Sequence, residues 1–179
     1  MRPATLIVAA ALLTATACSS SSSPAAAPAG PGTAPASAAA TTDAPKTAPA
    51  KDATAVLATL VAAVKTAKQG TVVTEATDGN HLLGRPGQYT SKVTFTDSRV
   101  KADDVMSNDP TDVGFGGSVE VFANAEDAKR RADYIQAIVK SLPAMMEYDY
   151  AHGPVVVRVS KLLTPSQAAE FDKAAAAFG

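Results

Sequence analysis

The chain has 179 residues, of which 46% are hydrophobic, and 16 Lys and Arg against 17 Asp and Glu residues give a formal net charge of −1. No basic excess points to a nucleic-acid partner. Cys18 is the single cysteine, so the chain has no internal disulfide. A signal of about 17 residues and a disordered stretch of about 34 leave roughly 125 to 130 residues, the usual size of one domain.

The first residues read as an export signal. Arg2 precedes the apolar run Leu6 to Leu13, and small residues follow up to Cys18, which predicts a signal peptide over residues 1–17. The stretch Ala15 to Cys18 resembles the bacterial lipobox, whose cysteine receives a diacylglycerol, although the pattern prefers leucine where Ala15 stands. We therefore expect a lipid on Cys18 that anchors the protein to the cell membrane on its extracytoplasmic face. The alternative is a secreted protein that is cut near Ala17 and keeps a free thiol.

A tether follows the signal. Residues 19–50 are almost only Ser, Ala, Pro, Thr and Gly, and none of them is aromatic. Such a segment cannot bury enough apolar surface to offset the entropy lost on ordering, so residues 18–52 are expected to be the lipidated cysteine and a disordered tether. A coil of this length spans roughly 34 Å on average. We expect one folded domain over residues 53–179.

The domain begins with a helical pattern over residues 53–69. Apolar side chains at spacings of one, three and four residues predict a buried stripe of Val56, Leu57, Leu60, Val61 and Val64. Gly70 is expected to end this helix, and a short strand over residues 71–74 follows it.

A turn then leads into the first clear strand. Arg85-Pro86-Gly87-Gln88 fits a type II turn, with proline second and glycine third. Residues 89–96 alternate, which is typical of a half-buried strand. We assign Tyr89, Val93 and Phe95 to its core face, and Thr90, Lys92, Thr94 and Thr96 to solvent.

Residues 97–117 form an acidic, turn-rich loop. Clustered carboxylates can bind calcium, but the loop lacks the glycine and glutamate positions of an EF-hand, so we expect a solvated loop without a metal. A strand over residues 118–122 and a helix capped by Asn124 come next. On this helix we assign Lys129, Arg130, Arg131 and Asp133 to solvent, with a basic ligand patch as the alternative.

Residues 147–160 predict a hairpin, and the valines at 155–157 indicate a strand that is buried on both faces. Thr164-Pro165-Ser166-Gln167 is a strong helix start with a capping box. The order helix, strand, strand, helix, strand, strand, helix predicts an α+β domain with a small, mainly antiparallel sheet and helices packed on one face.

Few residues suggest catalysis. The chain has two histidines, His81 and His152, no Gly-x-Ser-x-Gly elbow, too few nitrogen or sulfur ligands for zinc and no Gly-rich phosphate loop before a helix. We expect neither a cofactor nor a metal. A small cell-envelope hydrolase that uses His81 or His152 with a nearby carboxylate is the alternative hypothesis.

Two polar groups of residues are candidates for a ligand surface. One surrounds the turn before the first clear strand, and the other shares one face of the hairpin by parity. The candidate residues are Arg85, Tyr89, Tyr148 and His152. Turn chemistry and aromatic cover of the sheet are the plainer interpretation.

The stretches 82–92, 148–150 and 153–160 resemble those of small surface lipoproteins of high-GC Gram-positive bacteria (actinomycetes), a resemblance that covers most of residues 71–178. It implies a host class and a surface location, and no functional residue. The sequence thus leads to the hypothesis of a lipid-anchored, non-catalytic module that binds an envelope component or a partner protein.

Overall fold

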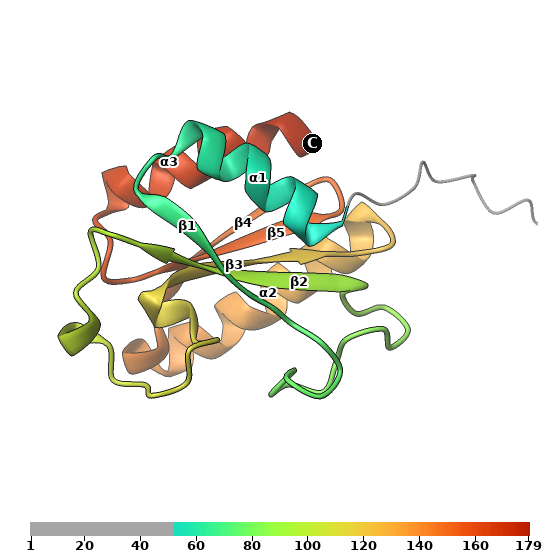
Figure 1. The fold of residues 1–179 in the computed structure, drawn as a ribbon. Coiled ribbons are helices and arrows are strands. Elements are labelled where there is room, and N and C mark those ends of the chain that lie inside the picture. The colour runs from blue at the N-terminus through green and yellow to red at the C-terminus, as the bar shows by residue number, and fades with distance from the viewer. Residues whose placement is uncertain (1–51) are drawn as a thin grey trace, which may run out of the picture. The chain divides into compact units, whose positions relative to one another are not determined.

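In the part of the chain that the structure describes, the fold is an antiparallel sheet of five strands with three α-helices, as the computed structural model shows (Figure 1). The structure describes residues 52–179, so the predicted signal peptide, Cys18 and nearly all of the tether lie outside the described residues. The helices are α1 (Ala53–Ala63), α2 (Ala125–Ser141) and α3 (Pro165–Ala175). The strands are β1 (Ala67–Val72), β2 (Ser91–Asp97), β3 (Gly116–Val121), β4 (Glu147–His152) and β5 (Val155–Ser160).

The strands lie in the order β1-β2-β3-β5-β4, and every neighbouring pair is antiparallel. Val119 in the central strand β3 pairs with Val93 of β2 and with Val157 of β5, so three valines cross the middle of the sheet on one face. The predicted α+β class and the antiparallel sheet are confirmed.

The larger core lies between one face of the sheet and the helices α1 and α3. Val56, Leu57 and Leu60 of α1 are fully buried there. Phe171 of α3 stacks on Phe95 of β2, with ring centroids 4.9 Å apart. Both rings are removed from water, which makes this stack a main source of hydrophobic stabilisation where α3 meets the sheet.

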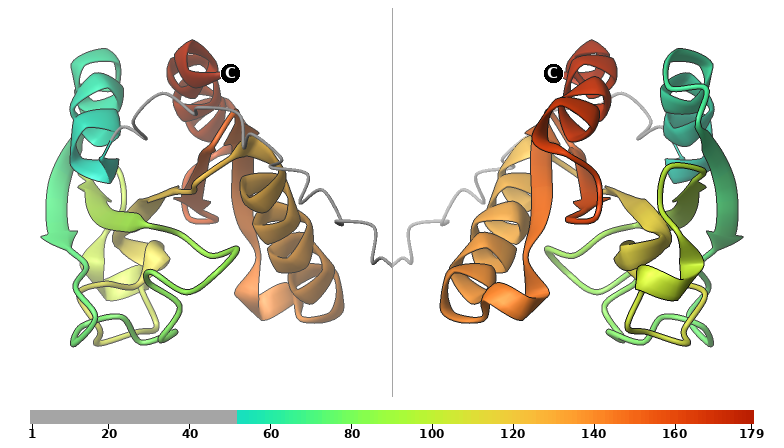
Figure 2. Two further views of the ribbon diagram at one scale, coloured as in Figure 1. Left: turned by 90° about the vertical axis from the view of Figure 1, so that its right-hand side faces the viewer. Right: turned by 90° about the vertical axis from the view of Figure 1, so that its left-hand side faces the viewer.

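Helix α2 covers the opposite face, so the expectation that all helices pack on one face is wrong. Figure 2 shows α1 and α3 together on one side of the sheet and α2 on the other. Ala128 and Ala132 of α2 form a second, smaller core with Tyr89, Phe122 and Val156. On β2 and β3 this face of the sheet carries charged and hydroxyl side chains, and for this reason the alternating pattern of β2 predicted a face exposed to solvent. Lys92 and Thr94, expected to be exposed, are buried.

The first helix is shorter than predicted. It ends at Ala63, and Ala67 already pairs with Asp97 as the first residue of β1. Gly70, expected to stop the helix, lies in β1 beside Thr94, which donates from its hydroxyl to Thr71 O and accepts from Thr71 N. Residues 67–69 suit a helix locally, but pairing with β2 determines their conformation.

The turn and the two helix caps that the sequence predicts are confirmed. Gln88 N donates to Arg85 O at 3.0 Å and Gly87 has φ +72°, as a type II turn requires. Asn124 caps α2 by accepting from Asp127 N. Thr164 and Gln167 form the predicted capping box of α3. These short motifs position the loops and helix ends around the sheet.

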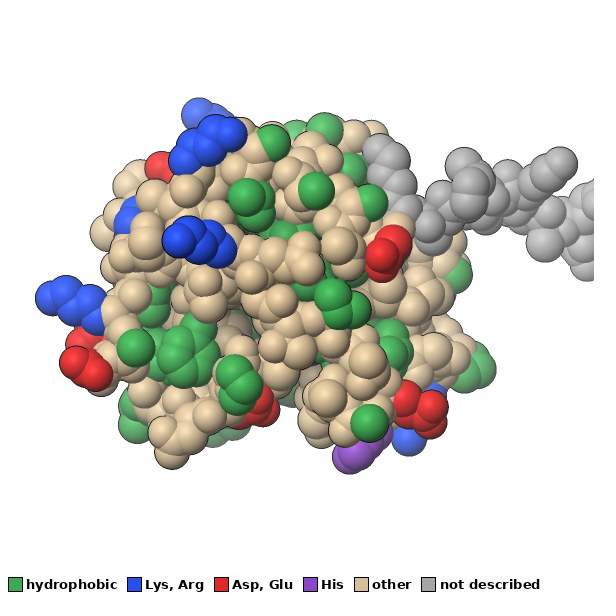
Figure 3. All heavy atoms as spheres, in the orientation of Figure 1, with side chains coloured by type: hydrophobic (Ala, Val, Ile, Leu, Met, Phe, Trp, Pro, Cys, Tyr) green, Lys and Arg blue, Asp and Glu red, His purple; other side chains and the backbone are tan. Residues whose placement is uncertain are grey.

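Figure 3 views the domain from the same side as Figure 1. Lys and Arg side chains stand apart from one another on this face and do not merge into one basic patch. Among the described residues, no helix combines the length and apolarity that crossing a membrane needs.

Candidate functional site

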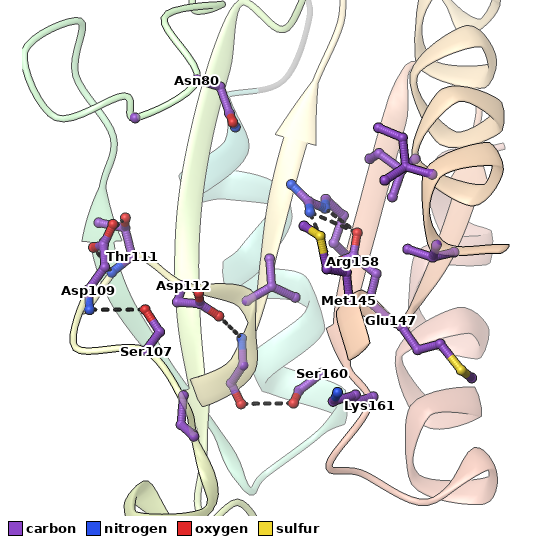
Figure 4. Close-up of a pocket in the computed structure, with 18 of the residues that line it drawn as sticks. Asn80, Ser107, Asp109, Thr111, Asp112, Met145, Glu147, Arg158, Ser160 and Lys161 are labelled. Carbon is purple, nitrogen blue, oxygen red and sulfur yellow. Dashed lines mark hydrogen bonds and ion pairs between the residues drawn. The ribbon is translucent and has the colours of Figure 1, made fainter. Parts of the chain in front are cut away.

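A cleft of about 1010 Å³ opens on the α2 side of the sheet. One wall is the second half of α2 with the segment that leads from it into β4, and the facing wall is formed by residues 77–82 and 104–114. Strands β2 and β5 supply Lys92 and Arg158 between these walls. Figure 4 shows Met145, Glu147 and Arg158 on one side, and Asn80, Ser107 and Asp109 on the other. Helix α2 covers only the β5–β4 side of this face, so the β2 side is left to loops.

A buried carboxylate with three cations lies beneath the cleft. Glu120 of β3 is fully buried; its Oε1 lies 3.2 Å from both Lys92 Nζ and Arg158 Nη1, and its Oε2 accepts from Arg131 Nε at 3.1 Å. Burial acts to raise the pKa of Glu120, but the charges of Arg158, Lys92 and Arg131 outweigh burial and lower this pKa to about 2. Glu120 is therefore ionised at neutral pH and holds together side chains from β2, β5 and α2.

Two further carboxylates, Glu147 and Asp149, complete the cluster. Glu147 of β4 accepts two hydrogen bonds from Arg158 Nη2, at 2.7 and 3.0 Å, and Asp149 accepts from Gln136 of α2. Asp149 Oδ1 is buried without a hydrogen-bond partner. Burial raises the pKa of Glu147 to about 7 and also raises that of Asp149. The Asp149 carboxylate further raises the pKa of Glu147, whereas the hydrogen bond with Glu147 acts to lower the pKa of Asp149. The pair thus retains a proton more readily than two separate carboxyl groups.

The lip of the cleft is apolar and exposed. Met106, Met145 and Met146 are 98%, 59% and 54% exposed, and they are all the methionines within the described residues. Tyr134 of α2 and Leu162 add two more exposed apolar side chains to the same lining. Methionine is flexible and polarisable, so it adapts to irregular apolar partners. Exposed apolar side chains that gather around one concavity mark a binding surface.

The structure does not bring the four candidate ligand residues together. Tyr89 is fully buried on the α2 side of the sheet, where its hydroxyl donates to Asp78 Oδ1 at 2.6 Å. Asp78 also accepts from Leu82 N and Leu83 N, so this residue fixes the loop that leads to β2. Arg85 is exposed in the turn that follows.

Tyr148 and His152 lie on the other face of the sheet, beside α3. The Tyr148 hydroxyl donates to Leu163 O, and His152 Nε2 lies 2.7 Å from Asp172 Oδ1 of α3. His81 is exposed in a loop with φ +53°. Within residues 52–179, neither histidine is hydrogen-bonded to a serine or threonine hydroxyl, which a hydrolase of the triad type needs as its nucleophile.

Arg131 corrects the predicted solvent face of α2. Lys129, Arg130 and Asp133 are exposed as expected, but the Arg131 side chain is only 10% exposed because it reaches Glu120. Among the described residues, no group of three or more His, Cys, Asp or Glu side chains is arranged to hold a metal ion.

Sequence reasoning missed Lys92, Glu120, Arg131 and Arg158 as a set. One signal was present: Glu120 stands between Val119 and Val121, and Arg158 follows the valine run of a strand predicted to be buried on both faces. A charge at such a position must be buried with a partner. The methionines carried no local pattern, because Met106 and the 145–146 pair line one cleft only in the folded chain.

Comparison of the chain with protein-family models, with curated proteins and with solved structures gives no match. The fold and the cleft together define a small α+β domain that has an open, apolar-lipped concavity over a buried charge cluster. The functional argument therefore depends on the chemistry of this cleft.

Proposed function

We propose that the protein is a lipid-anchored module on the extracytoplasmic face of the cell membrane, and that its domain binds an envelope component in the cleft beside α2. The single observation that supports binding is the exposed lip formed by Met106, Met145 and Met146 around a concavity of about 1010 Å³. Exposing these side chains costs solvation free energy, which a bound apolar group would recover. Neither His81 nor His152 lines the cleft, so binding is favoured there over the hydrolase alternative.

The anchor is supported by the sequence alone. Arg2, the apolar run at residues 6–13 and the lone Cys18 follow the order of a lipoprotein signal. The resemblance to surface lipoproteins of actinomycetes accords with this location. Such an anchor would keep the cleft close to the membrane and its components.

Replacing the cysteine tests the anchor. In cells that express the full chain, Cys18→Ala should abolish lipid attachment, so the protein should appear in the medium or remain uncleaved. Cell fractionation and the mass of the N-terminal peptide measure this outcome. Unchanged membrane retention of a processed Cys18→Ala protein would contradict the anchor.

Polar substitution of the lip tests the cleft. The sheet, both cores and the three helices of the described part of the chain come from residues 52–179 and belong to one compact unit, so this segment should fold by itself and serve as the soluble form. Nile red, a neutral apolar dye, should fluoresce on binding to it. The double variant Met145→Ser/Met146→Ser should lower the affinity for the dye by about tenfold, which corresponds to about 1.4 kcal/mol of lost apolar contact.

Val72→Thr is the matched control, because Val72 is 49% exposed and lies on β1 outside the cleft. It should leave dye binding unchanged. Lipid extract from the cell envelope should displace the dye from the wild-type segment. Equal dye affinity in the wild type and the double-methionine variant would show that the cleft is not the binding site.

A further inference from the structure

Arg131 and Lys92 hold hydrogen-bond donors that the protein itself does not use. The side chain of Arg131 is 10% exposed and that of Lys92 is 8% exposed, and both line the cleft. Arg131 donates to Glu120 through Nε only, and within residues 52–179 neither of its Nη groups has a hydrogen-bond partner. Lys92 contacts one Glu120 oxygen at 3.2 Å. A cation that is nine-tenths buried with free donors is prepared to bind an acceptor that is absent from the chain.

The charged side chains around these donors carry a net charge of one positive unit when the carboxylate pair holds a proton. Three cations, Lys92, Arg131 and Arg158, surround Glu120, and Arg158 is already shared with Glu147. Because burial raises the pKa of Glu147 to about 7 and that of Asp149 also rises, the carboxylate pair holds a proton below neutral pH. The cluster then carries two negative charges against three positive ones. An anion at Arg131 would balance the difference.

The facing wall limits how much charge a ligand can bring. Asp78, Asp104, Asp109 and Asp112 line it. Hydrogen bonds from Thr111 hold the pKa of Asp109 below its usual range, and the positive charge of Lys92 lowers it further. Hydrogen bonds from Thr111 to Asp109 and from Gly114 N to Asp112 hold these carboxylates on their own wall. A polyanion would be repelled there. A head group with a single negative charge fits, provided that it lies toward Arg131.

We infer that the cleft binds an anionic lipid amphiphile, whose single negative charge is held by Arg131 and Lys92 while its apolar tail contacts the methionine lip. This inference rests on the proposed binding function and adds the chemical class of the ligand. A lipid is favoured over a peptide because the flexible side chains of Met145 and Met146 suit a featureless hydrocarbon chain. The floor of the cleft is formed by the inner strands β2 and β5, whose backbone groups already pair within the sheet and are not free to pair with a peptide.

Amphiphiles with the same tail and different heads test the inference on the segment 52–179. Laurate carries one negative charge, monolaurin is neutral and dodecyltrimethylammonium is positive. Titration calorimetry below the micelle concentration should show that laurate binds at least about tenfold more tightly than monolaurin, because only the charged head forms charge-assisted hydrogen bonds with Arg131 and Lys92. The cationic amphiphile should bind more weakly than either, and acetate and inorganic phosphate should show no measurable binding.

Arg131→Gln should remove most of the preference for laurate over monolaurin. Arg130→Gln is the matched control: Arg130 precedes Arg131 on α2, is 58% exposed and pairs with Glu126 and Asp127 outside the cleft. It should keep the full preference. Arg131→Lys should retain part of the preference for laurate that Arg131→Gln removes. Circular dichroism of each variant establishes that it is folded, and the three-head series on the wild type does not depend on any variant.

The outcomes separate this inference from the proposed function. Equal binding of laurate and monolaurin, both weakened by Met145→Ser/Met146→Ser, would overturn the anionic head group and leave a binding module. Displacement of Nile red by an envelope peptide, with no binding of any of the three amphiphiles, would overturn the lipid class. Failure of Nile red, all three amphiphiles and the envelope extract to bind would overturn the proposed function itself.

Discussion

Glu120→Ala should lower the free energy of unfolding by about 3 to 5 kcal/mol, the cost of removing one partner from a buried ion pair. The carboxylate is fully buried and is the common partner of Lys92, Arg131 and Arg158. Without it, positive charges from two strands and one helix face one another across an emptied space. Urea denaturation of the segment 52–179 measures the loss, and a domain of this size has only about 5 to 15 kcal/mol to lose.

Two further variants isolate the cause. Glu126→Ala removes a carboxylate that is 84% exposed on α2 and should change stability by no more than about 0.5 kcal/mol. Glu120→Gln keeps the size and one acceptor oxygen and removes the charge, so its loss should fall between the other two. If Glu120→Ala were as stable as Glu126→Ala, the cluster would not hold β2, β3, β5 and α2 together as described.

Phe171→Ala should destabilise the domain by about 3 to 5 kcal/mol, because it empties the space of a fully buried ring. The ring stacks on Phe95 and joins α3 to the centre of the sheet, so the cavity cannot close without moving the helix. The melting temperature, followed by circular dichroism, should fall by more than about 10 °C.

Phe178→Ala provides the comparison for this loss. Phe178 also packs against the larger core, but it is only partly buried and lies after the end of α3. Its removal leaves a space open to water, so the loss should be less than half of that for Phe171→Ala. Equal losses would mean that α3 is held as strongly at its end as at the Phe95 stack.

The sequence predicted the structure well wherever the determining residues are close along the chain. The Asn124 cap, the capping box of Thr164 and Gln167, and the turn at residues 85–88 each depend on atoms three residues apart. Local chemistry is sufficient there. The hairpin of β4 and β5 was predicted for the same reason, because its strands are separated only by Gly153 and Pro154.

The prediction failed where the conformation or burial of a residue depends on a partner that is distant in the sequence. The alternating positions of Lys92 and Thr94 are typical of a strand face that is exposed to solvent. In the structure this face is buried, because Lys92 pairs with Glu120 of β3, which also binds Arg131 of α2. Residues 67–69 likewise read as helix until β2 pairs with them. The cleft was missed because its lip joins Met106 to Met145 and Met146 over about forty residues of sequence, a separation that no local pattern reports.

Strand β1 ends the sheet at one edge, where its register shifts between Gln69 and Val72. An unpaired edge is a template on which another chain can add a strand and begin aggregation. Here Lys68 and Gln69 point to solvent and the irregularity interrupts the row of backbone groups, so only a short stretch is open to pairing. Copies of the domain crowded together on one surface would therefore resist edge-to-edge association on this side.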